Sequence, residues 1–575
     1  MGFMEGVSAS PGMTRGKAVV YLPLDLNFTP RRVKERAAEL ARLSAAVARS
    51  IEELVRLKER VLREMGEEFA HIFRSQQTIL EDESIIGEIE EQIRGEGWCA
   101  EESVRQVFTT YRQMFEELGD DDYNKERVGD LEDVHARVLR NLLGKEEIDL
   151  SDLAEGSILV AAELLPSDTA LMSKERVSGM VTEKGGITSH VAILAKNLGI
   201  PAAVAVPGVT STVRNEDTVY LDVTDPEEAR VYVNPDQETR RELEQRWEEY
   251  KGRRKLLEAE KQLEPVTPDG RRITVSANIG SVEEIEAALE QGARSVGLFR
   301  SEFLFMKDKV LPDEETQFAA YKAAVEAFTD GFVILRTLDV GGDKSIDSLS
   351  IPREDNPFLG YRAVRISLDK PQLFRGQLRA ALRASAFGNL KVMFPMISGP
   401  NEVVRIRALL DELIRELDEE GIDYDRSMEV GIMVEIPSAV FMADELLEHV
   451  DFMSIGTNDL TQYLLAADRL NEKIRDYYQP FHPAVFRAIA RVVDAAHARG
   501  KWVGVCGELG GMPIAMPALI GLGVDELSMS AQTLPEAIHI IRRTRYQEAQ
   551  ELANRLLHMD SEPPIKALLQ RIAMS

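Results

Sequence analysis

Apolar residues recur at spacings of three and four between Arg31 and Gly144, with Glu, Arg and Lys between them. The repeat is clearest over one stretch, at Leu40, Leu43, Val47, Ile51, Leu54 and Val55. This period is typical of amphipathic helices that bury one face. It predicts a helical bundle, with further helices over roughly 66–95, 101–118 and 129–143.

Short apolar runs flank this helical segment on both sides. One run, 16–22, follows Pro11-Gly12 near the start of the chain. The runs after the bundle lie at 157–161, 179–182, 217–221 and 229–233. Runs of this length between turn residues predict strands. They indicate a small α/β domain that includes the N-terminal strand, with the helical bundle inserted between its parts.

A regular alternation of strand-like and helix-like segments begins after Pro265. The strand-like segments are 273–279, 295–300, 333–338, 391–396, 430–435, 452–456, 502–506 and 526–529. Eight strands separated by helices predict a (β/α)₈ barrel. The long loop through 355–362 is expected to carry function, as long structured loops in barrels often do.

These patterns divide the 575 residues into four segments. The prediction is a multidomain α and α/β protein with a small α/β domain at 1–29 plus 146–234 and a helical domain at 30–145. A charged linker helix follows at 235–264, and the barrel occupies 265–575.

Composition narrows the class of protein. The net charge of −29 argues against general binding to nucleic acid or anionic membranes. No apolar run reaches the length that spans a bilayer, so membrane insertion is not expected. The N-terminus lacks the basic and apolar regions of a secretory signal, and the two cysteines imply no disulfide framework. We therefore expect a cytoplasmic protein.

One short stretch, Gly-Gly-Ile-Thr-Ser-His at 185–190, precedes an apolar helical run. Glycines allow close backbone approach, and Thr188 and Ser189 are favoured N-cap types. Free N–H groups at a helix start attract anions and disfavour a charged imidazole. His190 is therefore a candidate phosphoryl acceptor, and the alternative is a capping turn with an exposed histidine.

Polar residues cluster after the ends of the predicted barrel strands, where barrel enzymes place their active sites. They are Arg300, Arg336, Lys344, Glu435, Asn458, Asp459, Arg469 and Cys506. Glu435 and Asp459 follow neighbouring strands and suit Mg²⁺, unless they are ion-pair acceptors for Arg300 or Arg336.

The basic residues suit a substrate that carries both phosphate and carboxylate, although each arginine has the alternative of pairing with the acidic surface. Cys506 is either a small hydrophobic residue or a thiol that delivers a proton to carbon.

Several longer motifs carry a family resemblance. They are 185–190, Gly-Leu-Phe-Arg-Ser-Glu-Phe-Leu-Phe-Met at 297–306, Arg-Thr-Leu-Asp-Val-Gly-Gly-Asp-Lys at 336–344, Asn-Pro-Phe-Leu-Gly-Tyr-Arg at 356–362, Met-Val-Glu-Ile-Pro at 433–437, Ser-Ile-Gly-Thr-Asn-Asp-Leu-Thr-Gln-Tyr at 454–463 and Cys-Gly-Glu at 506–508. In this order, over nearly the whole chain, they resemble enzyme I of the bacterial phosphotransferase system.

The resemblance implies phosphoryl transfer from phosphoenolpyruvate to His190 and then to the phosphocarrier protein HPr, with release of pyruvate. It implies that Arg300, Arg336, Asn458, Asp459 and Arg469 bind the substrate, assisted by Lys344 and Arg362. It further implies that Glu435 and Asp459 hold Mg²⁺ and that Cys506 protonates the enolate. The helical domain would bind HPr, the α/β domain would swivel, and the barrel would form a homodimer.

Two alternatives remain at this point. A pyruvate phosphate dikinase or phosphoenolpyruvate synthase shares the phosphohistidine and barrel modules, but it carries an ATP-binding domain before the histidine domain. A regulatory relative with low turnover would bind partners through its bundle. The chain also departs from the family pattern at Ile187, where Arg is common, and at Leu470, where Gly is usual.

Overall fold

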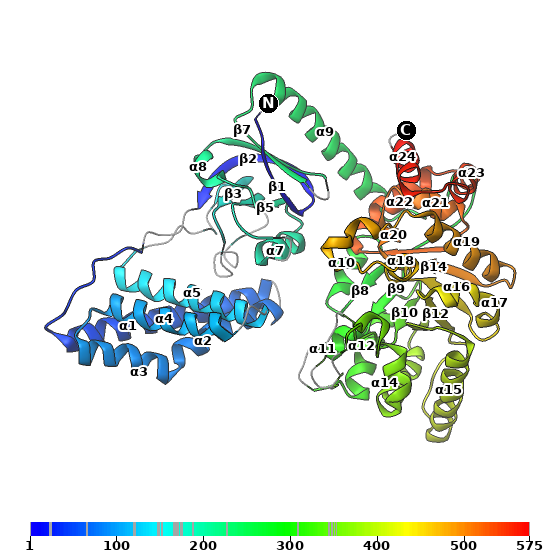
Figure 1. Ribbon diagram of the computed structural model, residues 1–575, viewed down its shortest axis with the longest axis horizontal. Helices are drawn as coiled ribbons and strands as arrows, with labels where there is room; N and C mark the ends of the chain where they lie inside the picture. The colour runs from blue at the N-terminus through cyan, green and yellow to red at the C-terminus, as the bar shows by residue number, and fades with distance from the viewer. Residues whose placement is uncertain are drawn as a thin grey trace. The chain divides into compact units, whose positions relative to one another are not determined.

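The computed structural model describes most of the chain as two compact units, Met1–Gly252 and Arg253–Ser575 (Figure 1). The described residues are 2–21, 26–64, 67–118, 122–145, 150, 153–164, 172, 176–186, 189–225, 228–306, 310–342, 346, 349, 351 and 354–573. Each unit has hydrophobic clusters of its own.

The helical segment of the first unit forms the predicted bundle. Its elements are α1 (Arg36–Glu64), α2 (Glu67–Glu81), α3 (Glu83–Glu91), the π-turn η1 (Gln92–Glu96), α4 (Ala100–Leu118) and α5 (Asp122–Leu143). Their apolar faces meet in one cluster that includes Leu43, Leu54 and Ile89. The helix predicted over 66–95 is interrupted, because the Asp82 carboxylate accepts the Ser84 N–H and starts a new helix.

Seven strands of the first unit close into a small barrel in the order β1-β5-β4-β3-β2-β6-β7. They are β1 (Met4–Ser10), β2 (Gly12–Tyr21), β3 (Ser157–Ala161), β4 (Val177–Thr182), β5 (Ala202–Val204), β6 (Thr218–Val223) and β7 (Glu228–Val233). Strand β2 pairs in parallel with β3, with Val19 opposite Leu159. The N-terminal strand therefore shares a sheet with strands that follow the bundle, as predicted.

The sequence pattern missed β1 and β5. Strand β1 contains Gly6, Ser8 and Ser10, and β5 is only three residues long, so neither presents a clear apolar run. The helices of this part are α7 (His190–Leu198), α8 (Val209–Thr212) and α9 (Gln237–Glu260). Helix α9 is charged over most of its surface, as expected for the linker helix, and packs Leu243 against Tyr220 and Tyr232.

The second unit is the predicted eight-stranded parallel barrel, closed in the order β10-β11-β12-β13-β14-β15-β8-β9. The strands are β8 (Thr274–Ile279), β9 (Val296–Arg300), β10 (Val333–Arg336), β11 (Leu390–Phe394), β12 (Val430–Val434), β13 (Phe452–Ile455), β14 (Trp502–Val505) and β15 (Glu526–Met529). Each agrees with a predicted strand to within a few residues.

Helical segments separate and cover these strands. They are α10 (Glu284–Glu290), α11 (Glu302–Met306), α12 (Glu314–Ala327), η4 (Pro357–Leu359), α13 (Val364–Asp369), α14 (Pro371–Ser385), α15 (Pro400–Glu420), α16 (Pro437–Phe441), α17 (Ala443–Leu446), α18 (Thr457–Leu465), η5 (Glu472–Tyr477), α19 (Pro483–His497), α20 (Glu508–Gly511), α21 (Met516–Gly521), η6 (Ala531–Thr533), α22 (Leu534–Arg543), α23 (Tyr546–Leu557) and α24 (Glu562–Ala573).

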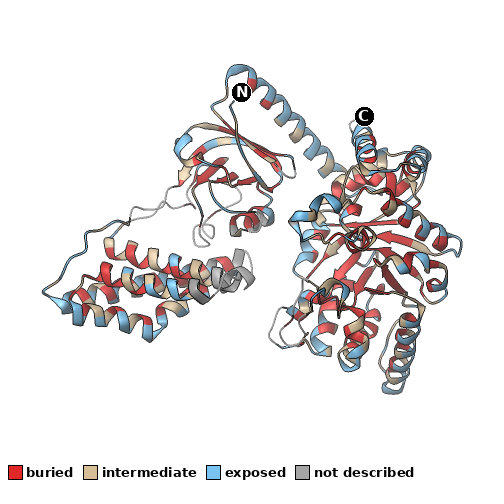
Figure 2. Ribbon diagram, viewed as in Figure 1, coloured by how far each residue is buried: buried red, intermediate tan, exposed pale blue. Residues whose placement is uncertain are grey.

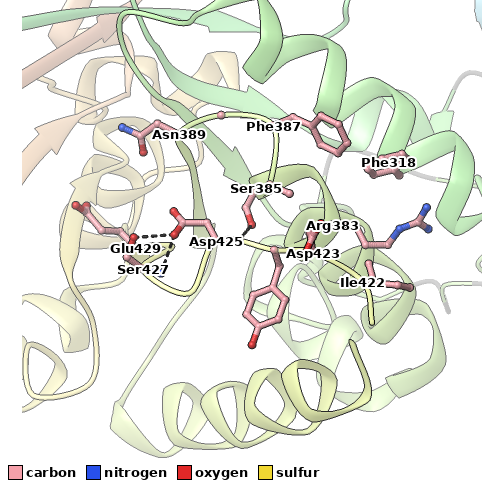
Figure 3. Close-up of a pocket in the computed structure, with 13 residues that line it drawn as sticks. Phe318, Arg383, Ser385, Phe387, Asn389, Ile422, Asp423, Asp425, Ser427 and Glu429 are labelled. Carbon is pink, nitrogen blue, oxygen red and sulfur yellow. Dashed lines mark hydrogen bonds between the residues drawn. The ribbon is translucent and has the colours of Figure 1, made fainter. Parts of the chain in front are cut away.

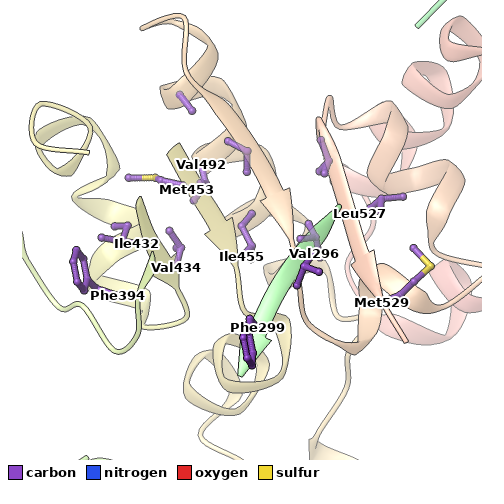
Figure 4. Packing of buried hydrophobic residues seen from close by; sticks show 14 of the residues in the cluster. Val296, Phe299, Phe394, Ile432, Val434, Met453, Ile455, Val492, Leu527 and Met529 are labelled. Atoms are coloured by element: carbon purple, nitrogen blue, oxygen red, sulfur yellow. The ribbon is translucent and has the colours of Figure 1, made fainter. Parts of the chain in front are cut away.

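Alternate residues of the barrel strands face outward and inward. The outward side chains, such as Val434, Ile455 and Leu527, pack against the helices and form the main core (Figure 4). The strands are buried over most of their length (Figure 2). Inside the barrel lie a smaller apolar cluster around Met433 and Phe452 and a set of buried polar residues. These inward residues build the site.

No helix in the described ranges combines the length and the apolar character that crossing a bilayer requires.

Candidate active site

Most of the predicted site residues lie where the barrel strands end. Arg300 and Arg336 are the last residues of β9 and β10, and Glu435 follows β12 directly. Asn458 and Asp459 lie in the first turn of α18, after β13, while Cys506 follows β14. The carboxyl ends of parallel strands meet at one face of a barrel, so these side chains share one mouth. Lys344 lies outside the described residues.

Buried ion pairs link the arginines and carboxylates of this mouth. Arg336 pairs with Glu302 and, at 2.9 Å, with Asp339. Asp339 also pairs with Arg362 at 3.1 Å, and Arg362 reaches Asp459 at 3.2 Å. Burial lowers the pKa of Arg336, but Glu302 and Asp339 outweigh it, so the pKa is raised and the cation is kept.

Arg469 and Arg300 are the more accessible cations of the mouth. Arg469 lies 3.8 Å from Asp459, and its backbone N–H donates to the side chain of Gln462. The neighbouring Leu470 is 59% exposed. Arg300 is half-buried, and its side chain makes no hydrogen bond or ion pair with any described residue. Its guanidinium is therefore available to a ligand.

Glu435 is buried, and its Oε1 accepts the Met396 N–H at 2.5 Å. Met396 has a φ of 56°, a conformation that non-glycine residues rarely adopt, and this turn aims its amide at the carboxylate. Burial raises the pKa of Glu435, and the charges of Asp459 and Asp339 raise it further. Several carboxylates therefore lie close together around Glu435, and carboxylate oxygens are ligands that Mg²⁺ prefers.

The described residues contain no group of three or more His, Cys, Asp or Glu side chains arranged to hold a metal. Two carboxylates with the other positions left to water and substrate remain a fitting arrangement for Mg²⁺, which usually keeps several waters. Glu435 and Asp459 are thus compatible with the predicted magnesium site.

Cys506 is buried beside Leu298, Met433 and Phe452 inside the barrel. Its Sγ lies 3.7 Å from the carbonyl oxygen of Ile455. Burial raises the pKa of the thiol to about 12. The sulfur therefore holds its proton at neutral pH, which a proton donor requires.

Asn458 connects two of the loops. Its Oδ1 accepts the Glu508 N–H at 2.9 Å, which ties the start of α18 to the start of α20. This bond fixes the segment after β13 against the segment that follows Cys506.

The other candidate site is the start of α7 in the first unit. The helix begins at His190, and the Ser189 side chain caps it by accepting the Ala192 N–H at 3.4 Å. Gly185 has a φ of 103°, as its position in the turn requires. Ile187 and Thr188 lie outside the described residues, as does the His190 side chain.

Known proteins resemble this chain over nearly its whole length. A family model described as the PEP-binding domain of PEP-utilising enzymes matches 254–546, and models of their N-terminal and mobile domains match 5–127 and 153–225. The phosphoenolpyruvate-protein phosphotransferase of Bacillus subtilis (strain 168) is 42% identical over 568 residues, which are 99% of each chain. The Haemophilus influenzae protein of that name is 42% identical over 573 residues, again 99% of each chain.

The chain belongs to the phosphoenolpyruvate-protein phosphotransferase family. The solution structure of an enzyme I protein, determined by NMR, shares 38% identity and covers 43% of this chain and 99% of its own, with a TM-score of 0.39. The relatives and the family models confirm the resemblance inferred from the motifs, and the two closed barrels of the structure confirm the α/β and barrel fold classes. The domain boundaries and the roles of individual site residues stay predictions.

Three members of the ion-pair network were not assigned roles from the sequence of this family member. Glu302 and Asp339 lie within the motifs at 297–306 and 336–344, and each pairs with an arginine of the mouth. Tyr463, which accepts a hydrogen bond from Arg362 at 3.1 Å, lies one helical turn after Asp459. Gly341 was a usable signal, because a Cβ there would lie 2.5 Å from the Cβ of Arg362. The close approach holds Arg362 between Asp339 and Asp459.

A separate open pocket of about 1070 Å³ lies at the other end of the barrel (Figure 3). Its lining includes Asn389 and Glu429, which precede β11 and β12, together with Phe318, Arg383 and Tyr424. The amino ends of barrel strands generally support stability rather than chemistry, so the opposite mouth remains the candidate active site.

Proposed function

We propose that this protein transfers the phosphoryl group of phosphoenolpyruvate to His190 and then to the phosphocarrier protein HPr, with release of pyruvate. This is the first step of the sugar phosphotransferase system. The observation that carries the proposal is the buried network at the barrel mouth, where Arg336, Arg362 and Arg469 meet Glu302, Asp339 and Asp459.

The cations of the mouth suit a substrate that carries both a phosphate and a carboxylate. The Arg300 side chain has no hydrogen-bond or ion-pair partner among the described residues, so it can turn to the substrate, and Arg469 lies at the same mouth, 3.8 Å from Asp459. Arg336 binds it from a fixed position, since Glu302 and Asp339 hold its guanidinium in place. Lys344 and Arg362 assist, the latter by orienting Asp459. Arginine forks match both anionic groups in bidentate geometry.

Glu435 and Asp459 would hold Mg²⁺ in the working enzyme. When bound, the ion supplies positive charge against the phosphate and the developing enolate. The chain contributes the carboxylate oxygens, the Met396 amide that orients Glu435, and the arginines that neutralise the remaining charge.

Cys506 acts after the phosphoryl group has left the substrate. Its thiol carries a proton at neutral pH because it is buried among apolar side chains. It gives this proton to the methylene carbon of the enolate, and pyruvate forms.

His190 accepts the phosphoryl group at the first residue of α7. The free N–H groups of that turn favour a neutral, nucleophilic imidazole before transfer and an anionic phosphoryl group after it. His190 and the barrel mouth belong to different compact units, and His190 must meet both the barrel mouth and HPr, so we expect the α/β domain to swivel between the two steps. The helical domain, 30–145, would dock HPr.

We also propose that the protein is cytoplasmic. We further propose that it forms a homodimer through its barrel. Sedimentation of the full chain and of a variant lacking 1–252 tests the dimer, since both should sediment as dimers. The dikinase alternative is not favoured, since the relatives align over 99% of both lengths. The other alternative, a regulatory relative, predicts that the protein converts little phosphoenolpyruvate to pyruvate.

The test is incubation of the full chain with radiolabelled phosphoenolpyruvate and Mg²⁺, with and without HPr. We expect one phosphoryl group per chain, complete loss of label in His190→Ala, and unchanged label in the control His558→Ala, which removes an exposed histidine of the barrel unit. Label should pass to HPr. Absence of label on the wild type, or equal label on His190→Ala, contradicts the proposal, and a requirement for ATP supports the dikinase.

A further inference from the structure

Glu526 is a buried acid that the chemistry above does not use. It is the first residue of β15, faces the barrel interior and is 1% exposed. Both of its carboxylate oxygens, and the buried hydroxyls of Ser276 and Ser454, lack a hydrogen bond of ordinary geometry to any described residue. Four such atoms in one barrel call for an explanation beyond packing.

Two glycines make room for this carboxylate. A Cβ at Gly297 would lie 2.1 Å from Oε1 of Glu526, and a Cβ at Gly504 would lie 2.2 Å from Oε2. Neither glycine has a positive φ, so backbone conformation does not require glycine at these positions. The need for space beside the carboxylate explains both glycines. The barrel is therefore built around an acid on β15.

Burial favours the neutral, protonated form of this acid. No described cation is among the groups that shift its pKa, which burial raises to about 8 although the Ser276 hydroxyl lowers it. The buried basic residues on the barrel strands are occupied: Lys391 pairs with Glu429 at 2.5 Å, and Arg336 pairs with Glu302 and Asp339. An unpaired carboxylate here would cost far more than a carboxylic acid.

A polar path joins this acid to the catalytic thiol. Gly504 is paired in register with Ser454 on one side and with Glu526 on the other. The position of a Cβ on Gly504 lies 2.2 Å from Oε2 of Glu526 and 3.4 Å from Oγ of Ser454. The two oxygens are therefore at most about 5.6 Å apart, a span that a direct hydrogen bond or one bridging water covers. Cys506 lies two residues beyond Gly504 on the same inward face, and the Ser454 hydroxyl is close enough to lower the pKa of its thiol.

We propose that Glu526 resupplies, through Ser454, the proton that Cys506 gives to the enolate. The inference rests on the proposed function. In the first step the S–H bond of Cys506 breaks and a C–H bond forms on pyruvate. The thiolate then takes the hydroxyl proton of Ser454, and Ser454 takes the carboxyl proton of Glu526, directly or through one water. Glu526 recovers its proton from solvent water before the next turnover, and it acts through Cys506 without touching the substrate.

The test uses Glu526→Gln in the full chain with excess HPr and Mg²⁺. The amide keeps the shape and neutrality of the acid but supplies no acidic proton. We expect His190 to be labelled fully and at the wild-type rate in the first turnover. Steady-state formation of pyruvate should then fall about ten- to a hundredfold, and the KM for phosphoenolpyruvate should fall by the same factor, so that kcat/KM is unchanged. Pyruvate should appear as a burst of one per chain before the slow phase.

Ser454→Ala provides a second arm, because it removes one small hydroxyl and leaves Glu526 in place. We expect the same slow phase, and the double variant should be no slower than either single variant. Steady-state rates equal to the wild type, additive losses, or a lost first turnover overturn the relay. Failure of the wild type itself to become labelled contradicts the proposed function instead.

Discussion

The chain folds into two closed barrels that differ in the residues filling their interiors. The seven-stranded barrel of the first unit is filled by apolar clusters, and Asp222, paired with Arg246 at 2.5 Å, is the buried charged residue among its described positions. The eight-stranded barrel buries Glu302, Arg336, Asp339, Glu435 and Asp459 at its mouth and Glu526 in its interior.

The difference follows from the chemistry assigned to each. An acceptor histidine needs only a helix start and a stable support, which apolar packing provides. A site that binds a multiply charged substrate needs fixed charges away from water, where they act strongly and keep their geometry. The second barrel therefore carries buried charges whose loss is costly, and the predictions below separate the two units on that basis.

The largest effect is expected from removing the thiol of the second barrel. Cys506→Ala should keep the binding of phosphoenolpyruvate and slow pyruvate formation by about 10²- to 10⁴-fold, because the enolate loses its proton donor. Coupled detection of pyruvate measures the rate, and binding by calorimetry is the control. Unchanged pyruvate formation would reject the role of Cys506.

The next effect concerns stability of the second unit alone. Arg336→Met leaves Glu302 and Asp339 without their shared cation and should lower the free energy of unfolding by about 3–5 kcal/mol. Hydrogen exchange measured by mass spectrometry should be faster in the barrel of the variant than in the wild type. Exchange in residues 1–252 should be unchanged. The matched control is Arg426→Met, whose pair with Asp418 is exposed and contributes less than about 1 kcal/mol. Equal losses in the two variants contradict the importance of the network.

A third effect is the response of the second unit to alkali. The pKa of Glu526 is about 8 in the fold against 4.5 ordinarily, so the folded state binds the proton more tightly. This stabilisation is complete below pH 4.5 and is lost as pH rises toward 8, at about 1.4 kcal/mol per pH unit. Denaturant unfolding of the wild type and of Glu526→Gln, followed by Trp502 fluorescence, should diverge over this window. Parallel curves would show that Glu526 is charged.

The smallest effect is expected in the helical bundle. There the dependence of stability on pH has the opposite sign to that of Glu526, because stability is lost as pH falls. His135 stacks on Phe108, and burial lowers its pKa from 6.5 to about 4. The unfolded chain therefore binds a proton that the fold excludes, and stability is lost as pH falls from 6.5 toward 4. We expect about 1 kcal/mol per pH unit, since His135 is partly exposed. His135→Leu should remove this dependence, measured by Trp98 fluorescence, and leave the barrel unaffected.

Local pattern predicted much of the molecule correctly. The eight barrel strands each appear as a short apolar run, because strands buried on both faces read that way. The bundle follows from its helical period, and His190 was placed at a helix start by its glycines and N-cap residues. Strands β1 and β5 were missed because closure of the small barrel, not their own composition, makes them strands.

The sequence by itself determined the fold class, the family and the residue types of the chemistry, since periodicity and motifs are local properties of the chain. Only the tertiary structure decided which charges meet. Asp339 lies between Arg336 and Arg362, Met396 aims its amide at Glu435, and Glu526 occupies the space of two glycines. Burial and ion pairing depend on which strands are neighbours, and that neighbourhood is established only when the barrel closes.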